Sequence, residues 1–565
     1  MEEPHALHRH ADRHATLWLS LTLAIIVGYQ MLGVWWGLDL CDSGFYLTFY
    51  DNIFTAPETV QYNFMFYLSG VLGGALQWLF PSMGVVGFRL AGVVVNTLAA
   101  IVIWLALRRH VPPLALAFGA LLVVMTYVKP VYTFCYDLLT ALLYVAAIAL
   151  LYRGLIDSRM RLIAAAGFVA GLNIFMRVPN VLGLAMVAVI IIDHRDSGTT
   201  WGTTWRRVAA FAAGVAAGIG VVVATMVAAG HWRLFLAILT DLQEISADTS
   251  GTATHSSTEL IMTQLRFYGN ELWCAAKFAV PIVSYTLLSQ RLQRAWLRWA
   301  LLAVCLAVVA WMALRMPSIQ PLWLLCVTGT VWAIVRGKRE VRIAAWLGLG
   351  MLLVFPLGSD GGAYNNGSII AWAAAPVAAI LWTRQRLLPF TIALLACSAV
   401  TAVTGGAYFD GGNLLSKTAV ITMPRAADIH TTPERAQAID SVMSGIASHV
   451  HEGDTLLVYG CAPMLNYLSH TRPAMGCSWP ELLSADALER RLATLDKCPP
   501  LVLRQKFSAM GQQWTTPSEE YLVHYPARNG FQDDRKLQVF NAFLQRHGYA
   551  ALYDDSHFVL LAPLP

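Results

Sequence analysis

The sequence predicts a helical, multi-spanning membrane protein of about thirteen transmembrane helices, followed by an external α/β domain. Three observations support this fold class. Hydrophobic residues make up 57% of the 565 residues and charged residues only 13%, with a mean hydropathy of +0.55. Soluble domains carry about 25% charged residues. Long apolar runs recur up to residue 405, and a charged segment with mixed strand and helix patterns follows them.

Each apolar run is a candidate span because a helix of about 20 residues crosses about 30 Å of hydrocarbon. Residues 17–37 form the first run, which we interpret as a retained span and not as a signal peptide, because no small-residue cleavage site follows it. The division at Arg177-Val178-Pro179 indicates a hairpin of two short helices. The runs are 17–37, 85–107, 111–128, 138–155, 162–176, 178–192, 208–229, 272–288, 299–314, 321–335, 343–357, 368–383 and 388–405.

Lys and Arg concentrate in the N-terminal tail and in alternate loops, which lie around Arg108, Arg153, Arg206, Arg291, Lys338 and Arg384. Basic residues near span ends stay on the cytoplasmic side. We therefore expect residues 1–16 to be a cytoplasmic tail, and residues beyond 405 to be external. This placement of the basic residues also excludes nucleic acid as a partner.

The C-terminal segment has the composition of a separate folded unit of normal domain size. We expect residues 17–405 to form the membrane domain, 406–423 a linker and 424–565 an α/β domain. Strands are predicted at 455–459 and 501–504, helices at 436–449, 485–495 and 535–548, and a final hairpin at 549–553 and 557–562.

Three of the nine cysteines, Cys461, Cys477 and Cys498, lie in this external segment. In an oxidising compartment two of them are expected to pair, with Cys461–Cys477 as the first choice. Cys41 and Cys135 lie on two external loops and offer a second bridge. Buried free thiols are an equal alternative for this second pair.

The first external loop begins with Asp42, directly after the first span. An acidic residue at the mouth of a membrane span is a candidate functional site. The same Asp42-Ser43-Gly44 sequence is also ordinary helix-capping chemistry. A second acidic residue, Asp137, opens the run 138–155 on the same predicted side of the membrane.

Two short motifs resemble the C-superfamily (GT-C) membrane glycosyltransferases, and most closely the branch of protein-mannosyltransferases and aminoarabinose transferases. These motifs are Asp42-Ser43-Gly44-Phe45-Tyr46 and Asp137-Leu138-Leu139-Thr140-Ala141. Ser43 departs from the family pattern, in which a second acid is commoner after the Asp. The resemblance covers roughly the first 200 residues. It implies transfer of a sugar from a polyprenyl-phosphate donor to a lipid, glycan or protein acceptor, at the external face of a bacterial inner membrane.

This chemistry needs a base for the acceptor and positive charge for the leaving phosphate. We expect Asp42 to be the base, with Asp137 as its partner or as a ligand of a divalent cation, Mg or Mn. Candidates for the phosphate are Arg177, Lys129, Arg266 and Arg89, of which Arg177 is the best placed. Further candidates for substrate binding are Tyr46, Glu58, Asn63, Asp360, Tyr364 and Asn365.

Other classes of protein also fit a multi-spanning chain of this kind. A lipid-linked sugar flippase is one, although no matched pair of interrupted spans marks the two halves. A polysaccharide polymerase or ligase would place its catalytic residues in a late external loop. A non-catalytic scaffold that presents the external domain is the remaining alternative.

Overall fold

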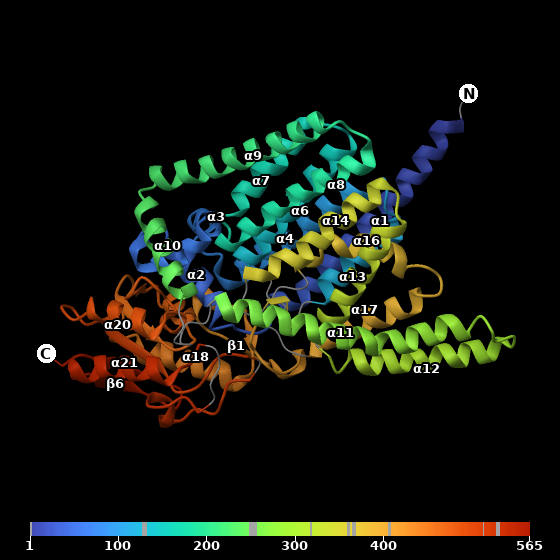
Figure 1. Ribbon diagram of the computed structural model, residues 1–565. Coiled ribbons are helices and arrows are strands. Elements are labelled where there is room, and N and C mark those ends of the chain that lie inside the picture. Colours follow the sequence, from blue (N-terminus) through green and yellow to red (C-terminus); the bar gives the residue numbers. More distant parts are fainter. Residues whose placement is uncertain are drawn as a thin grey trace.

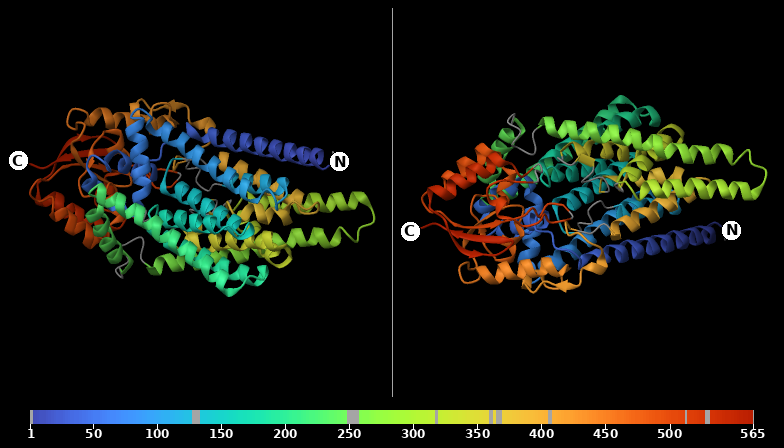
Figure 2. Two further views of the ribbon diagram at one scale, coloured as in Figure 1. Left: turned by 90° about the horizontal axis from the view of Figure 1, so that it is seen from above. Right: turned by 90° about the horizontal axis from the view of Figure 1, so that it is seen from below.

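The computed structural model describes residues 3–126, 133–247, 257–316, 319–358, 362–363, 369–404, 408–511, 513–526 and 531–564. A bundle of helices fills most of the molecule, and the C-terminal region lies against one end of it (Figure 1). The N-terminus lies at the opposite end of the bundle (Figure 2). The predicted fold class, a helical membrane domain with a C-terminal α/β region, is therefore confirmed.

Within the described residues, nine helical segments are long and apolar enough to cross a membrane. Each of the thirteen predicted runs corresponds to helical structure, and nine of them coincide with these long helices. The remaining runs form the short helices α5, α7 and α17, and the turn η4 with the nine-residue helix α16. Apolar composition alone does not distinguish a helix that spans the membrane from a short buried helix, because both contain few charged residues.

The helical elements follow one another with short connections. Their bounds are α1 Glu3–Val34, α2 Asp42–Asn52, η1 Pro57–Phe66, α3 Tyr67–Leu79, α4 Gly84–Leu107, α5 Pro113–Met125, α6 Tyr136–Ile156, α7 Met160–Asn173, η2 Val178–Val187, α8 Ala188–Ser197, α9 Trp201–Ala228, α10 Trp232–Ala247, α11 Ser257–Leu288, α12 Ala295–Ala313, α13 Ile319–Arg336, α14 Arg339–Val354, η3 Phe355–Gly358, η4 Ile369–Ala371, α16 Ala374–Trp382 and α17 Leu388–Thr404.

Helices α7 and α9 approach closely through small residues. Gly167 and Gly171 lie four apart on α7, and Gly214 and Gly218 lie four apart on α9. A Cβ atom on Gly167 would lie 2.0 Å from the carbonyl oxygen of Phe211. Such GxxxG pairs let membrane helices pack backbone to backbone, where association depends on close van der Waals contact.

The C-terminal region contains a five-stranded sheet with strand order β4-β3-β5-β7-β6. Strands β4, β3 and β5 are parallel, β7 pairs antiparallel with β5, and the edge strand β6 pairs antiparallel with β7. The predicted strands, helices and final hairpin are all found, with small shifts at their ends. The bounds are β1 Ala419–Val420, β2 His430–Thr431, α18 Pro433–Ile446, β3 Thr455–Tyr459, α19 Met464–Leu468, β4 Arg472–Pro473, η7 Pro480–Leu482, α20 Ala485–Ala493, β5 Leu501–Gln505, η8 Glu519–Leu522, α21 Asp534–Arg546, β6 Ala550–Asp554 and β7 Phe558–Ala562.

The predicted Cys461–Cys477 disulfide is wrong, because all nine cysteines are free. For Cys41 and Cys135 the alternative of buried free thiols is confirmed. The Cys461 thiol contacts Glu481 Oε2 at 3.2 Å, and the Cys477 thiol donates to the carbonyl oxygen of Trp479 at 3.1 Å. Cys41 donates to the carbonyl oxygen of Cys461 at 2.9 Å, so it is not bridged to Cys135. Burial raises the pKa of the Cys461 thiol, which favours the neutral form.

Candidate active site

The start of α2 is organised by Asp39, which the sequence analysis did not single out. Its fully buried carboxylate accepts the backbone N–H groups of Cys41 and Ser43 at 2.8 and 2.7 Å. These N–H groups lie at the N-terminus of α2, where backbone donors have no partner within the helix. The sequence carries one signal for this role of Asp39, because Asp39 is an acidic residue three positions before Asp42, where α2 begins. Asp39 therefore fixes the end of α2 that carries Asp42.

Two aromatic rings link α2 to α6 between the predicted acidic residues. Tyr46 follows Asp42 by one helical turn, and its ring meets that of Tyr136 edge to face at 5.3 Å. Asp137 is the next residue, in the first turn of α6. Burial is the main cause that raises the pKa of Tyr46, followed by the neighbouring Tyr136, Asp42, Cys135 and Asp137. The carboxylates of Asp42 and Asp137 thus act on one phenol from two separate elements.

Arg177 adds positive charge to this cluster. Its guanidinium lies 3.7 Å from Asp137 Oδ1, donates to the carbonyl oxygen of Phe355 at 3.0 Å, and stacks over the Phe355 ring at 4.7 Å. Only 5% of the residue is exposed. The side chain is therefore held in place and is not free to extend towards lipid head groups.

An apolar groove of about 240 Å³ includes Phe355, the ring on which Arg177 stacks, in its lining. It lies between the η2–α8 segment and α14, and Tyr144 of α6 also lines it. Leu182, Met186, Trp346 and Met351 line the remainder. Its lining is apolar along the membrane-spanning segments, so it is suited to a hydrocarbon chain.

The C-terminal region covers the N-terminal half of α2. The backbone N–H of Met464 donates to the carbonyl oxygen of Leu40 at 3.0 Å, and Thr48 donates to the carbonyl oxygen of Pro463 at 3.1 Å. A Cβ atom on Gly44 would lie 2.1 Å from the backbone nitrogen of Met464. Gly44 is required because the two backbones meet at this point.

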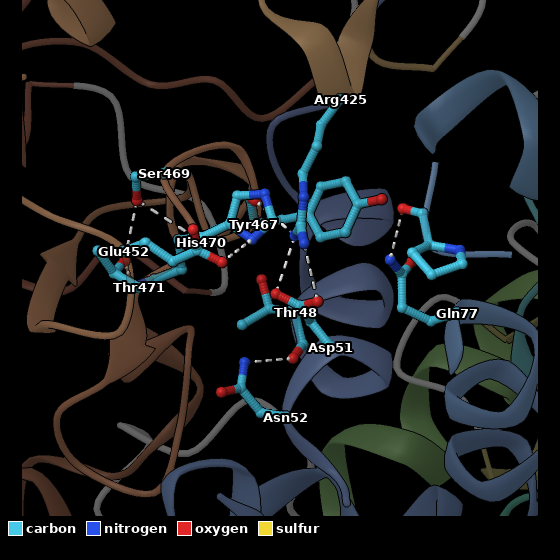
Figure 3. A network of polar contacts seen from close by, with 12 residues as sticks. Thr48, Asp51, Asn52, Gln77, Arg425, Glu452, Tyr467, Ser469, His470 and Thr471 are labelled. Atoms are coloured by element: carbon cyan, nitrogen blue, oxygen red, sulfur yellow. Dashed lines mark hydrogen bonds and ion pairs between the residues drawn. The ribbon is translucent and has the colours of Figure 1, made fainter. Parts of the chain in front are cut away.

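A charged contact closes the other end of this interface (Figure 3). Both terminal nitrogens of Arg425 bind the carboxylate of Asp51, at 2.8 and 3.0 Å. The same guanidinium lies over the Tyr467 ring at 4.4 Å and donates to the Tyr467 carbonyl oxygen at 2.9 Å. The contact ties α2 to the segment between β1 and β2 and to α19.

The remaining predicted residues have different surroundings. Asn63 is buried next to α2 and donates to the carbonyl oxygen of Phe45 at 3.3 Å. Glu58 is exposed at the start of η1, and Arg266 lies on the exposed side of α11. Arg89 is fully buried, where it donates to the carbonyl oxygens of Val34 and Gly37, so its charge supports the end of α1. Lys129, Asp360, Tyr364 and Asn365 lie outside the described residues.

Nothing in the described part of the chain gathers three or more His, Cys, Asp or Glu side chains in a geometry that could hold a metal ion. Asp137, the predicted ligand, is next to the guanidinium of Arg177. A cation so close to the carboxylate disfavours a second positive ion there. The divalent cation stays a prediction, and we assign no step to it.

Among solved structures, the chain is similar to ArnT from Cupriavidus metallidurans. The crystal structure bound to undecaprenyl phosphate matches with 14% sequence identity and a TM-score of 0.43, over 97% of this chain and 98% of that chain. The crystal structure of the apo state matches with 14% identity and a TM-score of 0.40, over 98% of each chain. No protein-family model matches the chain, and no curated protein matches it in sequence. At this level of similarity no residue role is transferred from one protein to the other.

Proposed function

We propose that this protein is a membrane glycosyltransferase that moves a sugar from a polyprenyl-phosphate donor to an acceptor at the external face of the membrane. The observation that carries the proposal is that Arg177, paired with Asp137, stacks on Phe355 in the lining of an apolar groove. Asp42 shares the surroundings of Tyr46 with Asp137. A donor with a hydrocarbon chain and a phosphate requires an apolar channel that ends at a positive charge.

In this proposal Asp42 removes the proton from the acceptor hydroxyl or amine. The acceptor atom bonds to the anomeric carbon while the bond from that carbon to the phosphate oxygen breaks. The phosphate leaves with the polyprenyl chain, and its negative charge is stabilised by Arg177. Asp137 holds the Arg177 guanidinium in position, at 3.7 Å.

The wall of aromatic rings around Tyr46 suits this reaction because it limits the access of water. Tyr136 stacks on Phe66 at 3.9 Å between ring centroids, and Phe45 contacts Phe66 and Trp479 edge to face. Excluding water strengthens the attraction between a phosphate and a guanidinium. It also suppresses hydrolysis of the donor.

The test is turnover of a polyprenyl-phosphate sugar by the full chain in nanodiscs. Asp42→Asn should lower the rate about 10²–10⁴-fold, since the amide cannot accept the proton. Asp428→Asn is the matched control, because Asp428 is exposed in the C-terminal region and its positive φ of 65° suits Asn. Its rate should equal that of the wild type.

Wild-type turnover in a stably folded Asp42→Asn protein would overturn the assignment of the base.

The same assay measured after chelation tests the predicted divalent cation. A full rate without metal is expected. A loss of rate that Mg or Mn restores would contradict our reading of Asp137.

A further inference from the structure

A second cavity, of about 260 Å³, lies in the C-terminal region away from the transfer site. We call it the α18 cavity, because the first turn of α18 contributes Glu434 and Arg435 to its wall. Gln513, Trp514 and Thr516 come from the loop after β5, and His557 precedes β7. The volume is slightly below the ~300 Å³ at which pockets for drug-sized ligands begin, so it has room for a small ring.

Arg435, which lines the α18 cavity, belongs to a buried ion-pair network. Arg435 binds Asp410 Oδ1 at 2.5 Å, and Lys417 binds the same oxygen at 3.1 Å, with the Asp410 side chain fully buried. The Arg435 guanidinium lies 4.7 Å from the centre of the Trp514 ring. The centres of the Phe507 and Trp514 rings are 4.6 Å apart. Trp514 is therefore held as a fixed apolar wall, and little side-chain entropy is lost when a ligand binds beside it.

The rim, in contrast, carries polar groups with unused hydrogen-bonding capacity. Within the described part of the chain, the side chains of Glu434, Gln513 and Thr516 form no hydrogen bond. His557 engages Ser556 through Nδ1 and leaves Nε2 available. These groups supply a carboxylate acceptor, an amide with donors and an acceptor, a hydroxyl and an imidazole.

This combination distinguishes between classes of ligand. An anion finds no net positive charge here, because the carboxylates of Glu434 and Asp410 together balance Arg435 and Lys417. A ring with several hydroxyl groups matches the mixed donors and acceptors and can place its C–H groups against the indole. We propose that the α18 cavity binds a neutral sugar ring.

The cavity is connected to the start of α2 through Asp410. Its Oδ2 atom accepts the backbone N–H of Leu38 at 2.9 Å, one residue before Asp39. A sugar held in the α18 cavity would thus be positioned by the framework that also supports Asp42. The cavity would then capture a glycan acceptor for the transfer reaction. This role rests on the proposed transferase function, whereas the binding of a sugar does not.

The experiment is ligand-observed saturation-transfer NMR and calorimetry on the full chain in nanodiscs. The probes are neutral tetrasaccharides of glucose, mannose, galactose and N-acetylglucosamine, with inorganic phosphate as the anionic probe. At least one tetrasaccharide should bind the wild type. Its affinity should fall about tenfold or more in the Glu434→Ala/Gln513→Ala variant. Both side chains are exposed, so their removal should leave the fold intact.

Gln437→Ala is the matched control, since Gln437 is exposed on the same helix and does not line the cavity. It should bind as the wild type does. Binding should also persist in Asp42→Asn, which separates this proposal from the proposed transfer reaction. Binding of phosphate without any tetrasaccharide, no binding of any probe, or equal binding by the double variant would each overturn the proposal.

Discussion

At the scale of single residues, the chemistry of the site depends on two carboxylates at the start of α2 with different surroundings. Asp39 is buried and bonded to two backbone N–H groups, whereas Asp42 retains partial exposure. Burial, followed by repulsion from Asp42, raises the pKa of Asp39 from 3.8 to about 7. Asp39 is therefore a positioning residue whose charge changes near neutral pH.

This pKa predicts a dependence of stability on pH. Between pH 3.8 and about 7 the folded protein binds a proton at Asp39 that the unfolded chain has released. The contribution of Asp39 is fully present below pH 3.8 and is lost as the pH rises through 7. The Tm of the wild type should therefore fall relative to the Tm of Asp39→Asn as the pH rises from 4.5 to 7.5.

Thermal unfolding in nanodiscs over this pH range measures the effect. Asp428→Asn is again the control, and its Tm should stay parallel to that of the wild type at every pH. Parallel curves for Asp39→Asn and the wild type would contradict the raised pKa of Asp39.

At the scale of elements, α2 is the helix through which the membrane domain and the C-terminal region meet. Most of its residues are buried, and Gly44, Thr48 and Asp51 face α19 and the segment around Arg425 along its length. The C-terminal region also reaches the membrane domain through an ion pair between Arg491 and Asp241 of α10. The expectation that residues 424–565 fold alone stays a prediction, since an excised domain would expose the side of α19 that packs on α2.

The Asp51–Arg425 pair predicts a measurable contribution of this interface to stability. The two side chains are 18% and 11% exposed, so the pair is only weakly screened by solvent. Arg425→Lys removes the two-pronged contact and the stacking on Tyr467, and should cost about 2 kcal/mol. A fall in Tm of several degrees should accompany it.

Arg546→Ala provides the comparison. Arg546 pairs with Asp496 at the surface of the C-terminal region, where both side chains are more than a third exposed. Its Tm should stay at the wild-type value, because exposed pairs contribute little. Equal Tm values for the wild type and Arg425→Lys would show that the α2 interface is held by apolar packing alone.

At the scale of the whole molecule, the N-terminus and the C-terminal region occupy opposite ends of the helical bundle (Figure 2). The basic loops predict which end is cytoplasmic. Reporter fusions at Arg195 and His430 test this orientation. The Arg195 fusion should give a cytoplasmic signal and the His430 fusion an external one. A cytoplasmic signal at His430 would reverse the orientation and remove the proposed reaction from the external face.

The sequence alone determined the class of the protein and much of its local structure. Apolar runs that recur with basic loops between them have few solutions other than a helical membrane domain, because lipid leaves backbone groups no external partner. The strands and helices after residue 424 were predictable for a similar reason, since their side-chain periods are 2.0 and 3.6. Asp42 and Asp137 were singled out because an acidic residue at the mouth of a membrane span is a candidate functional site. Arg177 was singled out because it divides two short apolar runs.

The tertiary structure decided what these residues do together. The burial of Asp39 depends on contacts made after the chain folds, and the packing of Met464 against Gly44 joins residues that are far apart in the sequence. The thiols of Cys41, Cys461 and Cys477 contact other groups in the folded protein, and their spacing in the sequence does not record these contacts. Arg89 and Arg266 illustrate the same limit: both are cations near span ends, yet one is buried among backbone carbonyls and the other faces outward, because helix packing sets the direction of each side chain.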